Sequence, residues 1–343
     1  MTASTSPLEA AAQLYNAGRV ALANLSDLTQ LAGRRVCVVG STGQIGSVLI
    51  ETLVQANATF LAGNPILLVG IARNAPRSSD PGCTFIAASV ADAEAVADLP
   101  DFDDVIYVAG TASDYLRRRQ ETINTQVVGL EAFLNRYAGC RSFVFISSTR
   151  VYGRISDGSP LSEDALACVP PMHLDNVYDS AKRLGESLCL WHARFGGTPA
   201  VVARLSNIYG AQDSQRSETA ISDFARQAAQ TGAIALKGHP DSTRNWTCVL
   251  DIAQGVLRAL IRGKAGEAYN IGSEEHLSSR QLAEMVAAAL PHPVSVQLPP
   301  GTAPLSLQNI SIAKAQQELG YRPGFTFGDL VPLVVAKTLR NNT

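Results

Sequence analysis

Short apolar runs alternate with amphipathic segments along the first two thirds of the chain. The runs are rich in β-branched residues, which is typical of buried parallel strands. They span residues 35–39, 66–71, 84–88, 104–108, 142–147 and 200–204. Apolar positions at helical spacing separate them, and the clearest such segment extends from Val177 to about Arg194. Strands that alternate with helices predict an α/β fold with a parallel, doubly wound, Rossmann-type sheet and right-handed crossovers.

The same patterns divide the chain into three regions. Residues 1–31 carry apolar positions at helical intervals, which predicts an N-terminal helical extension packed outside the sheet. Residues 32–210, together with 249–265, are expected to form the sheet domain. The regular alternation ends after Gly210, and residues 211–248 and 266–343 are expected to form a smaller C-terminal lobe.

Composition narrows the class of protein. The net charge of −2 provides no positive field to attract nucleic acid. We find no apolar run of about 18 residues, as a membrane span requires, and no secretory signal pattern at the amino end. The six cysteines are scattered without a Cys-x-x-Cys pair, and the five histidines show no ligand spacing. These features favour a cytoplasmic protein with reduced thiols and no metal site.

A glycine-rich turn follows the first predicted strand. The strand leads into Gly40-Ser41-Thr42-Gly43-Gln44-Ile45-Gly46, and a helical pattern follows. In this context, glycines allow a tight turn and a close approach of the backbone to a pyrophosphate at the helix N-terminus. An ordinary strand-to-helix turn can carry the same glycines, so the loop alone leaves both interpretations open.

Tyr178 and Lys182 lie four residues apart within the strongest helical pattern. Positions four apart share one face of a helix, so the ammonium is expected beside the phenol. A neighbouring cation favours the phenolate and makes a phenol with a free pKa of about 10 usable as an acid or base near neutral pH. The spacing is common by chance and gains weight only from the motifs around it.

Two later strands end in polar groups. The runs from Phe143 to Arg150 and from Val201 to Asn207 both pass from apolar to polar residues. Open parallel sheets bind ligands beyond the carboxyl ends of their strands, so Ser148 is a candidate to hydrogen-bond a substrate oxygen. A serine that caps the next turn would look the same. Arg244 suits a phosphate or carboxylate clamp, or else a surface ion pair.

Together these segments resemble the extended short-chain dehydrogenase/reductase family, in its NAD-dependent epimerase/dehydratase branch of sugar-nucleotide epimerases. The resemblance covers about Ala32 to about Leu339. Its motifs are the glycine loop, the serine strand at 146–153, the Tyr178/Lys182 pair and the segments 204–210, 266–272 and 312–323. It implies a smaller lobe that binds substrate, and a homodimer that packs through helices expected at 121–138 and 177–194.

The resemblance also implies residue roles. The catalytic residues are expected to be Ser148, Tyr178 and Lys182. Residues expected to bind the dinucleotide are Gly40, Thr42, Gly43, Gln44, Ile45, Gly46, Arg73, Ser89, Val90, Ala109, Gly110, Asn124, Tyr178, Lys182 and Leu205. Residues expected to bind the substrate are Thr111, Thr149, Arg150, Asn207 and Arg244. The substrate is expected to be a nucleotide sugar.

The type of reaction depends on one position. Dehydratases and decarboxylases of the branch carry an acidic residue two places before the tyrosine of the serine strand, where this chain has Arg150. The expected reaction is therefore plain hydride transfer, either C4-type epimerisation or NADPH-dependent reduction of a keto sugar or related metabolite. Arg150 contacts either a substrate anion or an acidic side chain at the surface. A non-catalytic, cofactor-binding protein is the alternative from another class.

The cofactor and substrate signals conflict in part. NAD-selective domains place an acid at the end of the second strand, but this chain has Ala72 followed by Arg73, which suits the 2′-phosphate of NADP. Sugar-nucleotide epimerases of the branch generally hold NAD, so NAD and NADP both remain open. Arg244 matches a diphosphate-binding arginine of the family, whereas the place of a second one holds Leu307. A substrate other than a nucleotide sugar is therefore also compatible with the sequence.

Overall fold

The computed structural model describes residues 6–74, 81–110, 117–153, 157–166, 176–210, 220–299 and 305–340. Its centre is a seven-stranded sheet in which every pair of neighbouring strands is parallel. The strand order is β10-β6-β5-β4-β1-β2-β3. The strands are β1 (Arg35–Val39), β2 (Leu67–Ala72), β3 (Thr84–Ala87), β4 (Asp104–Tyr107), β5 (Ser142–Ser148), β6 (Ala200–Leu205) and β10 (Ala268–Ile271). The predicted doubly wound α/β class is confirmed.

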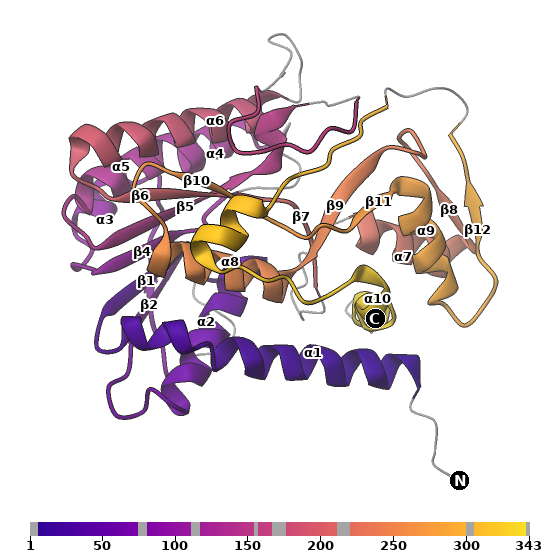
Figure 1. Ribbon diagram of the computed structural model, residues 1–343, viewed down its shortest axis with the longest axis horizontal. Coiled ribbons are helices and arrows are strands. Elements are labelled where there is room, and N and C mark those ends of the chain that lie inside the picture. Colours follow the sequence, from indigo (N-terminus) through magenta and orange to yellow (C-terminus); the bar gives the residue numbers. More distant parts are fainter. Residues whose placement is uncertain are drawn as a thin grey trace.

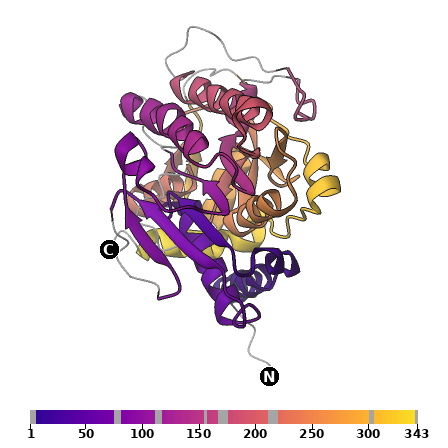
Figure 2. The ribbon, with the colours of Figure 1, turned by 90° about the vertical axis from the view of Figure 1, so that its left-hand side faces the viewer.

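Helices cover both faces of this sheet (Figures 1 and 2). One face carries α3 (Ala93–Ala97), α4 (Arg119–Ile123), α5 (Gly129–Arg136) and α6 (Asn176–Trp191). The other carries α2 (Gln44–Ala58) and α8 (Val249–Arg262). The strands read as continuous apolar runs because both of their faces are covered. For example, all four residues of β4 are buried.

Several shorter turns of helix connect or extend these elements. They are the 3-10 helices η1 (Ser26–Leu31) and η3 (Thr149–Tyr152), and the π-helices η2 (Asn124–Val128), η4 (His192–Gly196) and η5 (Ala315–Leu319). The η2 turn joins α4 to α5 without a break, and η4 continues α6. These π-helical turns matter for the site because they change which residues of a helix face inward.

A smaller group of elements lies beside the sheet. It contains a three-stranded sheet of β11 (His276–Ser278), β9 (Thr243–Cys248) and β7 (Asn207–Tyr209), and a two-stranded sheet of β12 (Ser295–Gln297) and β8 (Ala233–Ala235). The helices α7 (Ala220–Thr231), α9 (Ser279–Ala288) and α10 (Phe327–Arg340) pack with these strands (Figure 1).

The expected domain boundaries differ from the strand pairing at two places. The sequence pattern places residues 266–343 in the small lobe, yet β10 pairs with β6 and forms an edge of the large sheet. It places residues up to 210 in the large domain, yet β7 pairs with β9. Both differences have one cause: the pairing partner of a short strand lies far away in the sequence, and local pattern carries no information about it.

The N-terminal extension forms α1 (Pro7–Ala23) followed by η1. Ser6 and Glu9 make a capping box that starts α1. The helix packs against α2, α8 and α10 (Figure 1). Asp27 of η1 is buried and forms ion pairs with Arg258, at 3.2 Å, and with Arg262, both on α8. Ion pairs as well as apolar packing therefore hold the extension against α8, which covers one face of the large sheet.

None of the helices described is long and apolar enough to cross a membrane.

Candidate active site

The glycine loop is held tightly at the carboxyl edge of the sheet. Gly40 has φ +90° and donates its N–H to the Ile71 carbonyl over 2.8 Å. A Cβ at Gly40 would lie 2.7 Å from the backbone nitrogen of Ala109, at the end of β4. A Cβ at Gly46 would lie 2.3 Å from the Gly40 carbonyl oxygen. Only glycine fits at either position, so the spacing of the motif follows from close backbone contact.

The loop opens into the N-terminus of α2. Gly43 is the N-cap residue and supplies no side-chain hydrogen bond to the first turn, which also contains Gln44, Ile45 and Gly46. Backbone N–H groups at such an end attract anions, and the helix dipole adds to the effect. Thr42 lies in the same turn and is exposed. A helix N-terminus without a side-chain cap, beside backbone that approaches closely at Gly40 and Gly46, fits the pyrophosphate of a dinucleotide.

The second strand ends beside this loop with a basic residue. Ala72 is buried, and Arg73 pairs with Glu121 of α4, with 2.8 Å between Nη1 and Oε1. The same carboxylate accepts two hydrogen bonds from Arg118. Arg73 is about half exposed. At the edge where the ribose would lie, Arg73 and Arg118 therefore share the single carboxylate of Glu121. Within the described residues, no acidic side chain lies at the end of β2 itself.

The other predicted dinucleotide contacts are distributed along the same edge. Ala109 and Gly110 follow β4, and Ser89 and Val90 follow β3. Gly110 lies directly over Gln126, whose Nε2 would be 2.0 Å from a Cβ there. Leu205 ends β6 and is buried. Asn124 is half-buried and its side chain accepts a hydrogen bond from Gln120 over 2.9 Å. Thr111 lies outside the described residues.

Tyr178 and Lys182 share one face of α6, as their spacing predicts. Both are buried, and the Lys182 Nζ lies 5.8 Å from the centre of the Tyr178 ring. Lys182 donates to Gln126 Oε1 over 2.6 Å and to the Ile146 carbonyl of β5. Burial lowers the pKa of Lys182 from 10.5 to about 7, and the nearby Glu186 carboxylate opposes this change. Lys182 can therefore gain or lose its proton near neutral pH.

Ser148 stands at the end of β5, two residues after the carbonyl that Lys182 contacts. It is half-buried, and its hydroxyl accepts a hydrogen bond from the Arg150 N–H over 3.3 Å, which caps η3. The structure shows that this serine caps the turn, and it places the residue at the carboxyl edge of the sheet. Its contact with a substrate oxygen stays a prediction. Thr149 is buried, and its carbonyl accepts a hydrogen bond from Gln308 over 2.9 Å.

Arg150 lies against the tyrosine. Its guanidinium carbon is 5.3 Å from the centre of the Tyr178 ring, within the range of a cation–π interaction. Arg150 also donates to both carboxylate oxygens of Asp179, over 2.6 and 3.3 Å. Of the two expectations for this residue, the structure shows the ion pair, but the acidic partner is the residue next to Tyr178 and is largely buried.

The substrate residues expected in the small lobe lie on two paired strands. Asn207 begins β7 and is half-buried, and Arg244 lies on β9. Arg244 donates to the carbonyls of Thr243 and Ser306, over 2.7 and 3.3 Å. These bonds attach the guanidinium to the segment that contains Leu307, which forms a bridge with Thr243.

Gln126 and Glu186 were not foreseen from the sequence. Gln126 lies in the π-helical η2 turn, two residues beyond the expected Asn124, and is the group that contacts Lys182. Glu186 lies one turn after Lys182 on α6. It accepts hydrogen bonds from Ser147 over 2.5 Å and from Arg204 over 2.8 and 3.0 Å. The regular spacing Tyr178–Lys182–Glu186 was the available signal for Glu186.

Among the described residues, no group of three metal-ligating side chains could hold a metal ion. The chemistry available at the carboxyl edge is a phenol, a lysine of lowered pKa and a serine, beside a loop shaped for pyrophosphate.

A model of the NAD dependent epimerase/dehydratase family matches residues 36–272. The chain belongs to this family. Membership confirms the predicted relation to the extended short-chain dehydrogenases/reductases and identifies the protein as an enzyme that uses a nicotinamide dinucleotide.

Individual relatives differ in their reactions. UDP-glucuronic acid decarboxylase 2 of Arabidopsis thaliana is 26% identical over 308 residues, which cover 88% of this chain and 68% of that protein. A dTDP-glucose 4,6-dehydratase of Streptomyces antibioticus is 29% identical over 308 residues, covering 85% and 88%. The structure of RMD from Pseudomonas aeruginosa complexed with NADPH superimposes with a TM-score of 0.71 at 23% identity, covering 89% of this chain and 98% of that one.

Proposed function

We propose that this enzyme is an NAD(P)-dependent sugar-nucleotide epimerase, which acts by transient hydride transfer at a sugar carbinol of the C4 type. The observation that carries the proposal is the composition of the site around Tyr178: Lys182 is present and buried, while the position that would supply an elimination acid holds Arg150. The relatives' names support a nucleotide sugar as the substrate class.

In this proposal, Tyr178 holds the proton that the substrate hydroxyl gains or loses. Lys182 stabilises the phenolate when protonated, and its pKa of about 7 lets it share in the proton transfer near neutral pH. Ser148 orients the substrate oxygen from the end of β5. The bound nicotinamide supplies the hydride chemistry, and the protein supplies position and electrostatics. Gly40, Gly43 and Gly46 hold the pyrophosphate at the N-terminus of α2.

The ion pair at Arg150 argues against elimination or decarboxylation in this chain. Asp179 is the carboxylate next to Tyr178, and it accepts hydrogen bonds from Nε and Nη2 of Arg150. A carboxylate whose two oxygens both accept hydrogen bonds from a guanidinium is occupied by that ion pair. The described residues therefore place no acid at the tyrosine that is ready to protonate a leaving group, although relatives of this family carry out those reactions.

A second candidate is an NADPH-dependent ketoreductase of a keto sugar or related metabolite. Arg73 beside Ala72 favours it, because the end of β2 lacks a carboxylate for an unphosphorylated ribose. Identification of the dinucleotide released on denaturing the freshly purified protein separates the two candidates. Retained stoichiometric NAD supports the epimerase. An empty protein that binds NADPH much better than NADH supports the reductase.

The substitution Tyr178→Phe tests the catalytic assignment. It removes one hydroxyl and should abolish turnover while dinucleotide binding is preserved. Tyr209→Phe is the matched control, because the Tyr209 hydroxyl is buried and makes no hydrogen bond within the described part of the chain. Turnover that survives in the Tyr178 variant would refute the site. A wild-type protein that binds the dinucleotide but turns over no nucleotide sugar or keto sugar would favour the non-catalytic alternative.

We further propose a homodimer formed through α5 and α6, in the cytoplasm. Several large apolar side chains are exposed on α6, on the η4 turn that extends it and on η2, namely Val128, Leu184, Leu190, Trp191 and Phe195. Phe195 is 74% exposed, which is costly for an isolated subunit. Light scattering that gives the mass of a single chain would contradict this arrangement.

A further inference from the structure

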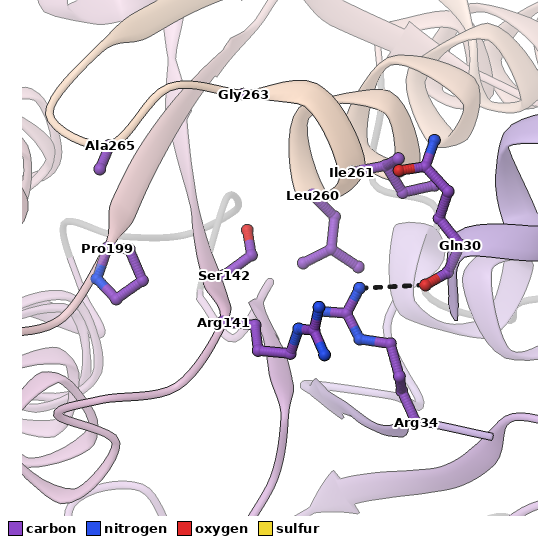
Figure 3. A pocket seen from close by; sticks show the side chains of 9 residues that line it. All are labelled: Gln30, Arg34, Arg141, Ser142, Pro199, Leu260, Ile261, Gly263 and Ala265. Carbon is purple, nitrogen blue, oxygen red and sulfur yellow. Dashed lines mark hydrogen bonds between the residues drawn. The ribbon is translucent and has the colours of Figure 1, made fainter. Parts of the chain in front are cut away.

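A cavity of about 230 Å³ (Figure 3) lies at the amino edge of the large sheet. The glycine loop lies at the opposite, carboxyl edge. The cavity is bounded by the chain that enters β1, by the start of β5, by the residue before β6 and by the end of α8. None of the proposed catalytic or cofactor residues lines it. Its polar lining comes chiefly from Arg34, Arg141, Ser142 and Gln30.

Among the residues that line the cavity, two are arginines and none is acidic. Arg34 is engaged, because it donates to the Gln30 carbonyl over 3.1 Å and pairs with the fully buried Asp104. The side chain of Arg141 makes no hydrogen bond or ion pair with any residue that the structure describes. Both guanidiniums lie close enough to stabilise the Asp104 carboxylate electrostatically. The buried Asp104 thus lies near both arginines of the cavity, and Asp103 is a second carboxylate near Asp104 that does not line the cavity.

A neutral donor completes the lining. Ser142 begins β5 and is largely buried, and its hydroxyl hydrogen-bonds to no other described residue. Figure 3 shows this hydroxyl and the guanidiniums of Arg34 and Arg141 around one opening. Guanidinium groups recognise carboxylates and phosphates through paired N–H donors, and a hydroxyl adds a further donor. The cavity offers donors and positive charge, and it is large enough for a small ion and its water.

We propose that this cavity binds a small oxyanion, a phosphate or a carboxylate group, between Arg141 and Arg34 with Ser142 as a third donor. The site is separate from the proposed epimerase chemistry and does not depend on it. Gln30 and Arg34 precede the segment that the family model matches, which begins at residue 36. The bound anion would therefore join Arg34, which follows the N-terminal extension, to Arg141 and Ser142 at the start of β5.

The test is a titration of the full-length protein with inorganic phosphate at constant ionic strength, followed by calorimetry. Saturating dinucleotide is present, so that the glycine loop cannot bind the phosphate. Arg141→Gln removes the unpaired guanidinium, and Arg35→Gln is the matched control, since Arg35 is exposed nearby but does not line the cavity. We expect Arg141→Gln to weaken binding at least about ten-fold, as the loss of hydrogen bonds to a charged group implies. Arg35→Gln should leave the affinity nearly unchanged.

A parallel titration with acetate separates the two sources of the oxyanion. Binding of phosphate alone indicates a phosphate site, and binding of both indicates a site for carboxylates as well. Absence of saturable binding of either anion to the wild-type protein would overturn the proposal. Equal affinities in the wild type and the Arg141→Gln variant would do the same.

Discussion

The buried ammonium of Lys182 makes a quantitative prediction about stability. Its pKa falls from 10.5 in the unfolded chain to about 7 in the fold. Each pKa unit corresponds to about 1.4 kcal/mol, so the charged form disfavours folding by about 5 kcal/mol at pH values below 7. Between pH 7 and 10.5 the unfolded chain binds more protons than the folded one. Stability from this group therefore increases as pH rises through that interval.

The substitution Lys182→Met removes this titration. From pH 6 to pH 10, we expect the free energy of unfolding of the wild type to rise by about 4 kcal/mol relative to that of the variant. This pH range covers most of the interval between the two pKa values. The variant also leaves Gln126 Oε1 and the Ile146 carbonyl without their donor. That loss costs about 1–3 kcal/mol for each acceptor but is independent of pH, so it changes the offset and not the slope.

Urea denaturation of the dinucleotide-free protein at several pH values measures the difference directly. Lys237→Met is the control, because Lys237 is exposed and its removal should give a difference that is flat with pH. A difference between wild type and Lys182→Met that is flat, or that falls as pH rises, would refute the reasoning. It would mean that the ammonium is solvated or paired better than its surroundings indicate.

Two further substitutions test the glycine loop and the contact that the sequence did not reveal. Gly46→Ala places a Cβ 2.3 Å from a backbone oxygen, so the loop must shift. Dinucleotide affinity should fall sharply, and the free energy of unfolding should fall by about 1–3 kcal/mol, as it does when a core is overpacked. Gly63→Ala, where a Cβ meets nothing within 4 Å, should change neither quantity in the same titration and melting experiments. Gln126→Leu removes an acceptor from the Lys182 ammonium, so the pKa of Lys182 should fall further and the pH dependence of dinucleotide affinity should move to lower pH. Gln120→Leu, at an exposed position of the same helical segment, should leave that dependence in place, and an unchanged profile for Gln126→Leu would show that the contact is unimportant.

The large sheet could be predicted closely because burial on both faces leaves a strong local signal. The six strands expected from apolar runs each begin and end within one residue of the observed strands. The glycine loop could also be predicted from local sequence, because its glycines follow a strand directly and lead into a helical pattern. The spacing of Tyr178 and Lys182 placed both on one buried face of α6.

Features that depend on distant partners could not be predicted. Arg150 forms an ion pair with Asp179, and Arg73 forms one with Glu121. In each pair the two residues are far apart in the sequence, so the local pattern does not predict the pairing. The contact between Gln126 and Lys182 depends on a π-helical turn, which periodicity of 3.6 residues does not anticipate. The placement of β10 in the large sheet likewise follows from long-range pairing.

The packing of α1 against α10 has a consequence for synthesis of the chain. Roughly 300 residues separate the two helices, so the ribosome completes nearly the whole protein before the partner of the first helix emerges. Contacts between such distant segments form late and slowly. Until then, the part of α1 that packs against α10 lacks its cover. A nascent chain that stalls before residue 327 would present this apolar surface to chaperones and proteases.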